Sequence, residues 1–193
     1  MIGEVEITVP EETELIQEVY TDGGCAGAPR SQIGGAIAFK YVGPCVRGLR
    51  SQFIHPEDVR SEDVTNNNVE LLAAICALEF YLDLMLTQPR LPRTIRLYTD
   101  SASALHWIKG DWKISSQPQY LIKRRDLVKQ RCIDNGLYVK LTLIAGHPTP
   151  TERAQGWKMK GTTQYQVSVH NEDCDKQCTR LCKEKMQELC KVT

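Results

Sequence analysis

Four acidic residues stand where the sequence pattern places the boundaries of secondary-structure elements. Asp22 and Asp100 each close an expected strand. Glu70 lies in the opening turns of a long expected helix, and Asp175 lies near the start of the last one. Hydrolysis of a phosphodiester by two Mg²⁺ ions about 4 Å apart requires several hard oxygen ligands. Because carboxylates at neighbouring strand ends and helix starts can converge on one point, these residues are the candidate catalytic and metal-binding groups.

Each of the four acids also has a simpler structural explanation. Asp22 before Gly23 is typical of a turn, Asp100 or Ser101 would cap the helix that follows, and helix dipoles favour negative charge near helix starts. Glu70 fits this explanation less well, because on a helix it shares its face with small residues that would press against a sheet. Those residues are Ala73, Ala74 and Ala77. A partly buried carboxylate there needs a partner.

Alternating and helical periodicities predict the elements that must position these acids. The expected strands cover residues 15–21, 34–41, 46–54, 95–99 and 137–144, and the expected helices cover 66–86, 100–108, 119–132 and 171–190. The first strand should end in a turn at Asp22-Gly23-Gly24. Three sequential strands followed by alternating helices and strands indicate an α/β domain with a mixed sheet. We assign residues 1–14 to an N-terminal extension, an edge strand or a tail, and residues 15–193 to this domain.

Residues 150–169 interrupt the pattern and predict a β-hairpin insertion. Apolar and polar residues alternate on both sides of an expected three-residue turn, Gly161-Thr162-Thr163. The expected apolar face comprises Trp157, Met159, Tyr165, Val167 and Val169, and the expected polar face comprises Lys158, Lys160, Gln164 and Gln166. Our hypothesis is a flap beside the active site whose lysines touch a nucleic-acid backbone. An inert surface hairpin is the alternative.

Composition restricts the class of protein further. Hydrophobic residues make up 41% and charged residues 25% of the 193 residues, which is ordinary for a globular protein. With 24 basic and 24 acidic residues, any nucleic-acid binding must come from a local patch. The acidic N-terminus and the lack of long apolar stretches predict a cytoplasmic or nuclear protein that is not secreted and does not contact a membrane. None of the eight cysteines forms a CxxC pair, so we expect reduced thiols, with Cys174, Cys178 and Cys182 in the core.

Four short segments resemble, in order, the signature blocks of type 1 ribonuclease H. They are YTDGGC at 20–25, TNNNVEL at 65–71, YTDS at 98–101 and NEDCD at 171–175. The resemblance spans roughly residues 17–185. It implies a ribonuclease H-like five-stranded mixed sheet, with the first three strands antiparallel, flanked by helices. It further implies an endonuclease that cuts the RNA strand of RNA/DNA hybrids and leaves a 5′-phosphate and a 3′-hydroxyl.

The resemblance also assigns roles to individual residues. Two Mg²⁺ ions, with Mn²⁺ as a substitute, would be held by Asp22, Glu70, Asp100 and Asp175. Asn66 would read RNA 2′-hydroxyls, helped by backbone amides near Gly23 and Cys25. Thr65 would contact a phosphate of the DNA strand, and helix capping is the alternative for Thr65 and Asn66.

Two parts of the chain depart from the family pattern. The family places a histidine about ten residues before the last aspartate, whereas His147 precedes Asp175 by 28 positions (175 − 147) and His170 by five. We favour His147, which follows an expected strand, and a loop histidine without a role is the alternative. The Trp- and Lys-rich protrusion of bacterial members is shortened here, which resembles the retroviral and archaeal types, but Trp112 and Lys113 remain as candidate substrate contacts.

Three functions are compatible with this pattern. The first is the hybrid-cutting enzyme, expected as a monomer that acts alone or within a larger replication or reverse-transcription assembly. The second is a noncatalytic relative that binds or tethers hybrids, and retention of four mutually repelling carboxylates argues against it. The third is a nuclease of the same fold that acts on DNA, and the TNNNVEL segment argues against it.

Overall fold

The computed structural model describes residues 5–7, 15–27, 30–112 and 118–191. The strands are β1 Val5–Ile7, β2 Ile16–Cys25, β3 Arg30–Ser31, β4 Gly35–Val42, β5 Val46–Ile54, β6 Val64–Thr65, β7 Thr94–Thr99, β8 Tyr138–Leu143, β9 Trp157–Lys160 and β10 Thr163–Gln166. The helices are α1 Asn66–Thr87, α2 Ala102–Lys109, α3 Gln119–Asp134, α4 Pro150–Gln155 and α5 Val169–Cys190, with a short 3-10 helix at Pro56–Val59. No helix among these residues is long and apolar enough to cross a membrane.

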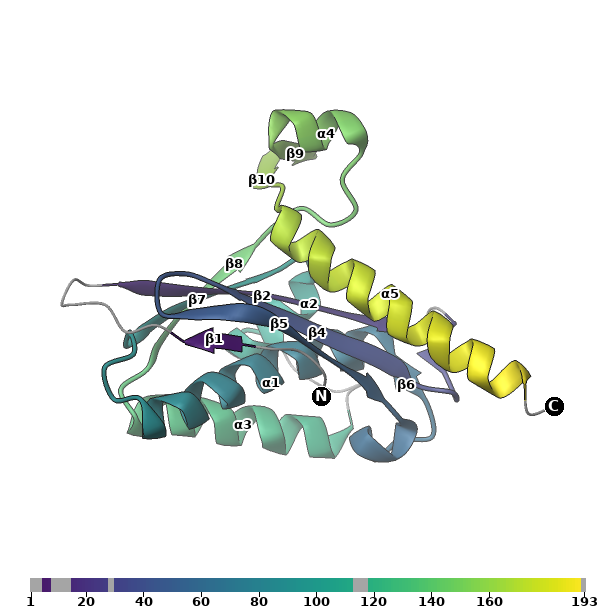
Figure 1. Ribbon diagram of the computed structural model, residues 1–193, viewed down its shortest axis with the longest axis horizontal. Coiled ribbons are helices and arrows are strands. Elements are labelled where there is room, and N and C mark those ends of the chain that lie inside the picture. Colours follow the sequence, from purple (N-terminus) through teal and green to yellow (C-terminus); the bar gives the residue numbers. More distant parts are fainter. Residues whose placement is uncertain (1–4, 8–14, 28–29, 113–117, 192–193) are drawn as a thin grey trace.

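A six-stranded sheet in the order β1-β5-β4-β2-β7-β8 forms the centre of the molecule (Figure 1). The pairs β2–β4 and β4–β5 are antiparallel, whereas β2–β7 and β7–β8 are parallel. The five expected strands and the antiparallel order of the first three are therefore confirmed. Residues 5–7 of the N-terminal extension add a sixth strand, which pairs antiparallel with β5 at the sheet edge.

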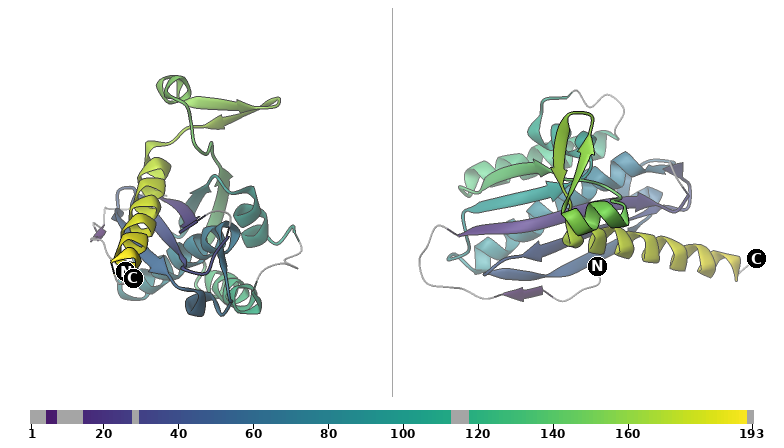
Figure 2. Two further views of the ribbon diagram at one scale, coloured as in Figure 1. Left: turned by 90° about the vertical axis from the view of Figure 1, so that its right-hand side faces the viewer. Right: turned by 90° about the horizontal axis from the view of Figure 1, so that it is seen from above.

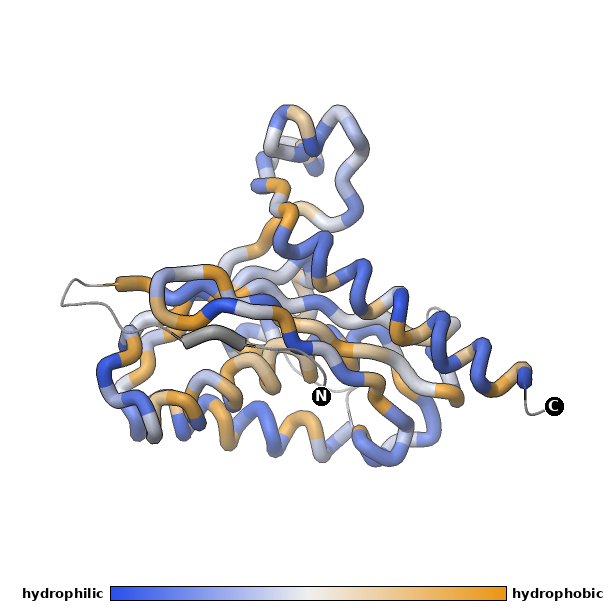
Figure 3. Tube along the Cα trace, viewed as in Figure 1, coloured by the Kyte–Doolittle hydropathy of each residue, from blue (hydrophilic) through white to orange (hydrophobic). Residues whose placement is uncertain are grey.

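Helices cover both faces of the sheet. Helices α1 and α3 lie on one face and α5 lies on the other (Figure 1). Helix α1 is apolar over most of its surface and lies between the sheet and α3, whereas α3 and α5 alternate between apolar and polar residues along their length (Figure 3). The two faces of the sheet accordingly carry two separate hydrophobic clusters, a larger one under α1 and a smaller one under α5.

Cysteine thiols line the contact between α5 and β2. The thiols of Cys174, Cys178 and Cys182 donate hydrogen bonds to β2 carbonyl oxygens at 3.5–3.6 Å. The acceptors are Tyr20, Asp22 and Gly24, every second residue of the strand. Cys174, Cys178 and Cys182 are buried thiols without a disulfide, which confirms the expected core packing of these three.

The turn expected at Asp22-Gly23-Gly24 is wrong. Strand β2 continues through these residues to Cys25, and Asp22 pairs with Ala38 of β4. Gly23 serves a close approach instead: a Cβ atom there would lie 2.5 Å from the carbonyl carbon of Val69 in α1. Because glycine lets the backbones of α1 and β2 come together, Glu70 is brought to the strand that carries Asp22.

Candidate active site

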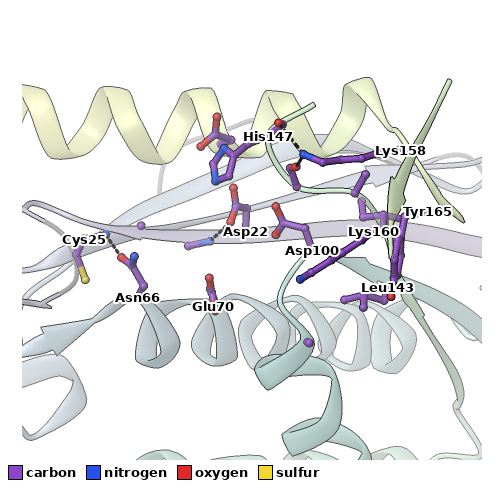
Figure 4. A pocket seen from close by; sticks show the side chains of 17 residues that line it. Asp22, Cys25, Asn66, Glu70, Asp100, Leu143, His147, Lys158, Lys160 and Tyr165 are labelled. Carbon is purple, nitrogen blue, oxygen red and sulfur yellow. Dashed lines mark hydrogen bonds between the residues drawn. The ribbon is translucent and has the colours of Figure 1, made fainter. Parts of the chain in front are cut away.

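All four predicted carboxylates line one cavity of about 440 Å³. Asp22 comes from β2, Glu70 from α1, Asp100 from the end of β7 and Asp175 from the second turn of α5. Figure 4 shows Asp22, Glu70 and Asp100 between α1 and α5, with His147 beside them. Residues separated by up to 153 positions (175 − 22) therefore meet at one end of the sheet.

Asp22 is the most buried of the four, with 8% of its surface exposed. Its Oδ1 accepts a hydrogen bond from the amide of Gly23 at 2.7 Å. Burial raises the pKa of Asp22 well above its ordinary value, and the negative charges of Asp100, Asp175 and Glu70 raise it further against the effect of that hydrogen bond. The four carboxylates repel one another, and a bound cation would relieve this repulsion.

Glu70 is held in place by the neighbouring helix start. The Ser101 hydroxyl donates to Glu70 Oε2 at 2.5 Å, and Ser101 Oγ accepts a hydrogen bond from the amide of Ala104 at 3.1 Å. Ser101, rather than Asp100, is thus the cap of α2. Burial raises the pKa of Glu70 to about 7; the Ser101 hydrogen bond and His147 lower it, and Asp100 raises it.

The segment after β8 passes directly against Asp100. A Cβ atom at Gly146 would collide with the Asp100 carboxylate, so glycine lets the chain pass here without displacing that carboxylate. His147 follows in the left-handed region, at φ 44°, and lines the cavity. Burial raises the pKa of Asp100, whereas the nearby charge of His147 and a hydrogen bond from Asn171 lower it.

The structure separates the two candidate histidines. His147 lines the cavity, whereas His170 packs against the ring of Tyr20 at a centroid distance of 5.1 Å in the contact between α5 and β2. Sequence reasoning did not single out Asn171, which is 4% exposed and next to Asp100. Its place at the start of the NEDCD segment was the available signal.

Asn66 lines the same cavity. Its Oδ1 accepts a hydrogen bond from the backbone amide of Cys25 at 3.0 Å. The amides of Gly23 and Cys25 both donate hydrogen bonds within the protein, and a role of the amides near them in substrate binding stays a prediction. The bond leaves the Asn66 side-chain NH₂ as the donor available to the cavity.

Thr65 and Trp112 do not line this cavity in the structure. Thr65 caps α1: its hydroxyl oxygen accepts from the amide of Asn68 at 3.2 Å and its hydroxyl contacts the Asn68 side chain. Trp112 stacks on His106 at a centroid distance of 4.3 Å and is 47% exposed. Lys113 lies outside the described residues.

The hairpin insertion is present, but its two faces differ from the prediction. The turn contains two residues, so Lys160 pairs with Thr163 and Lys158 pairs with Tyr165. A shift of one residue transfers every side chain of a strand to the other face. Tyr165 therefore joins the lysines, and Lys158, Lys160 and Tyr165 line the cavity. Trp157 and Met159 lie on the opposite, exposed face with Gln164 and Gln166.

The chemistry of the carboxylates fits a divalent cation. Hard oxygen donors from four elements line one cavity, and their charges raise the pKa of Asp22. Across the described residues, no three His, Cys, Asp or Glu side chains converge closely enough to enclose an ion, so the acids face a shared cavity rather than forming a closed cage. The candidate ligands are the four carboxylates predicted from the sequence.

Comparisons with known proteins agree with the fold and with the sequence resemblance. The RNase H family model matches residues 15–193. The ribonuclease H of Bartonella tribocorum is 32% identical over 166 residues, which cover 79% of this chain and 92% of that protein. RNase H1 from Halobacterium salinarum superimposes with a TM-score of 0.57 at 18% identity, covering 88% of this chain and 98% of that chain. The N-terminal RNase H domain of a Mycobacterium tuberculosis protein gives 0.60 at 14% identity, covering 91% and 99%.

Proposed function

Because the chain belongs to the type 1 ribonuclease H family, we propose that it is an endonuclease that hydrolyses the RNA strand of RNA/DNA hybrids with bound Mg²⁺. The observation that carries this proposal is the convergence of four carboxylates on one cavity beside Asn66 and His147. Asp22, Glu70, Asp100 and Asp175 would hold two Mg²⁺ ions, or Mn²⁺ as a substitute. When bound, the ions activate a water molecule and stabilise the leaving oxygen, which gives 5′-phosphate and 3′-hydroxyl products.

The residues of the chain supply position and selectivity. Asn66 donates through its side-chain NH₂ because its Oδ1 is held by Cys25, and a ribose 2′-hydroxyl is an acceptor that DNA lacks. His147 lies beside Asp100, where it can move a proton or assist product release. Thr65 stays a candidate for contact with a DNA phosphate at the start of α1.

A cleavage assay on matched duplexes tests the proposal. Wild-type protein with Mg²⁺ should cut an RNA/DNA hybrid and leave RNA/RNA and DNA/DNA duplexes of the same sequence intact. Asp100→Asn removes one charge without changing the side-chain shape and should reduce cleavage by at least about 100-fold, the scale of losing one electrostatic contact to a transition state. Asp134→Asn, on the exposed end of α3, is the matched control and should cut like wild type.

The outcomes separate the three functions. Binding of the hybrid without cleavage would support a tethering module. Cleavage of the DNA duplex would support a DNA nuclease of the same fold. Either result would contradict the proposed activity.

A further inference from the structure

The chain between His147 and α5 folds into a small module of its own, comprising α4, β9 and β10 (residues 150–166). It stands away from the sheet beyond the start of α5 (Figures 1 and 2). Helix α4 begins with a capping box, in which Thr149 and Glu152 each accept a hydrogen bond from the other's backbone amide. The module is thus a built structure at the edge of the active-site cavity.

Contacts at its base fix the module to the site. The amide of Ala145 donates to the Gln166 carbonyl at 2.9 Å, which ties β10 to the exit of β8. The Lys158 ammonium donates to the carbonyls of Gly146 and His147 at 3.1 and 3.2 Å. It also pairs with Glu152 at 3.7 Å, so its charge and its donors are used within the protein.

Lys160 lies on the same strand and the same face but differs in its contacts. It is exposed and lines the cavity, and among the residues that the structure describes no carboxylate lies within ion-pair distance of its ammonium. Figure 4 shows its side chain extending from the hairpin in the direction of Asp100, next to Tyr165. A flexible ammonium that donates to no other group in the described part of the chain, at the rim of a nuclease cavity, is suited to bind a phosphate.

The cavity therefore has two walls with the carboxylates between them. Asn66 and Cys25 form one wall, and Lys160 and Tyr165 form the other. A nucleic-acid strand whose phosphate meets the carboxylates has to pass along both walls. Lys158 is already paired with Glu152. Lys160 is therefore the cation of the hairpin wall that can attract the phosphate backbone of the nucleic acid.

We propose that the module is a second nucleic-acid-binding wall, in which Lys160 binds a backbone phosphate of the hybrid next to the cleaved bond and Lys158 holds the wall in place. The proposal rests on the proposed function for its substrate. The insertion then makes a phosphate contact through Lys160 alone, and this contact does not depend on the base sequence of the hybrid.

The salt dependence of hybrid cleavage tests this contact. The logarithm of the binding constant falls linearly with the logarithm of the salt concentration, and each phosphate neutralised by a protein cation makes this slope steeper by about 0.9. In Mg²⁺, Lys160→Gln should lower kcat/KM for the hybrid at 50 mM KCl and reduce the slope of log kcat/KM against log KCl by about 0.9. The advantage of wild type over the variant should shrink by about 3.5-fold between 50 and 200 mM KCl. Lys160→Arg keeps the charge and should keep the slope.

Lys191→Gln is the matched control, since it removes the same charge at the far end of α5, some 30 Å from the module by helix length. Its slope should equal that of wild type. If wild type cuts the hybrid and Lys160→Gln and Lys191→Gln give equal slopes, the proposed Lys160 contact is wrong and the proposed function still holds. If wild type does not cut the hybrid at all, both are overturned.

Discussion

Replacing Glu70 by Gln should stabilise the cation-free protein at alkaline pH while removing its activity. Burial raises the pKa of Glu70 from 4.5 to about 7, so folding favours the protonated form. Such a group favours folding below pH 4.5, and this contribution is lost as the pH rises through about 7. Above about pH 7 the folded protein contains an ionised, partly buried carboxylate at position 70, whereas Gln at this position stays neutral.

The size of the effect follows from the shift. A rise from 4.5 to about 7 is roughly 2.5 pKa units, and at about 1.4 kcal/mol per unit the upper limit is about 3.4 kcal/mol. Glu70 is only partly buried, so solvent screening reduces the gain to about 1–2 kcal/mol. Gln can still accept the hydrogen bond from Ser101, so the substitution leaves the helix start supported.

Urea unfolding in EDTA at about pH 8 and about pH 4 measures the gain. We expect Glu70→Gln to be more stable than wild type near pH 8. Near pH 4 the two should be equally stable, because Glu70 of wild type is then protonated in both the folded and the unfolded protein. Glu62→Gln, at an exposed position before β6, should show no gain at either pH. Mg²⁺ should raise the stability of wild type more than that of the variant. A gain of equal size at both pH values would refute the electrostatic reasoning.

Two further substitutions test the packing that positions the site. Gly23→Ala places a Cβ atom 2.5 Å from a backbone carbon of Val69 and should cost about 3 kcal/mol or more in urea unfolding, whereas Gly24→Ala, whose nearest neighbour lies 3.8 Å away, should cost less than about 1 kcal/mol. Lys158→Met frees the carbonyl of His147 and releases the hairpin wall, so kcat for the hybrid should fall about tenfold, the scale of one charged hydrogen bond, and KM should rise. Lys158→Arg should restore most of the turnover, and a loss confined to KM would contradict a positioning role.

The elements that hold the site were predictable because their apolar patterns reflect burial directly. The expected helix at 66–86 is α1 at 66–87, and the expected strand at 46–54 is β5 without change. A helix that is apolar around most of its circumference and strands buried on two faces leave few alternatives. Helix α4 was missed, because its six residues, PTERAQ, begin with a proline and are mostly polar, a pattern that resembles a loop as much as a helix.

The register of the hairpin shows where such prediction stops. Alternation along 157–166 predicts two strands but contains no information on whether the turn holds two or three residues. One residue decides which side chains face the cavity. Gly161 takes φ +62°, the loop is shorter than expected, and Tyr165 therefore faces the site with the lysines.

Two glycines make the site possible, and both would be taken from the sequence for turn residues. Gly23 lets the backbone of α1 approach β2, which brings Glu70 to Asp22. Gly146 lets the chain after β8 pass against Asp100, which brings His147 there. In both places the side chain is absent because another part of the chain occupies its space. That requirement is set by residues distant in sequence, so local propensity reports only that glycine bends easily. The acids were identifiable from their types, but the closeness that lets them act together depends on these two positions.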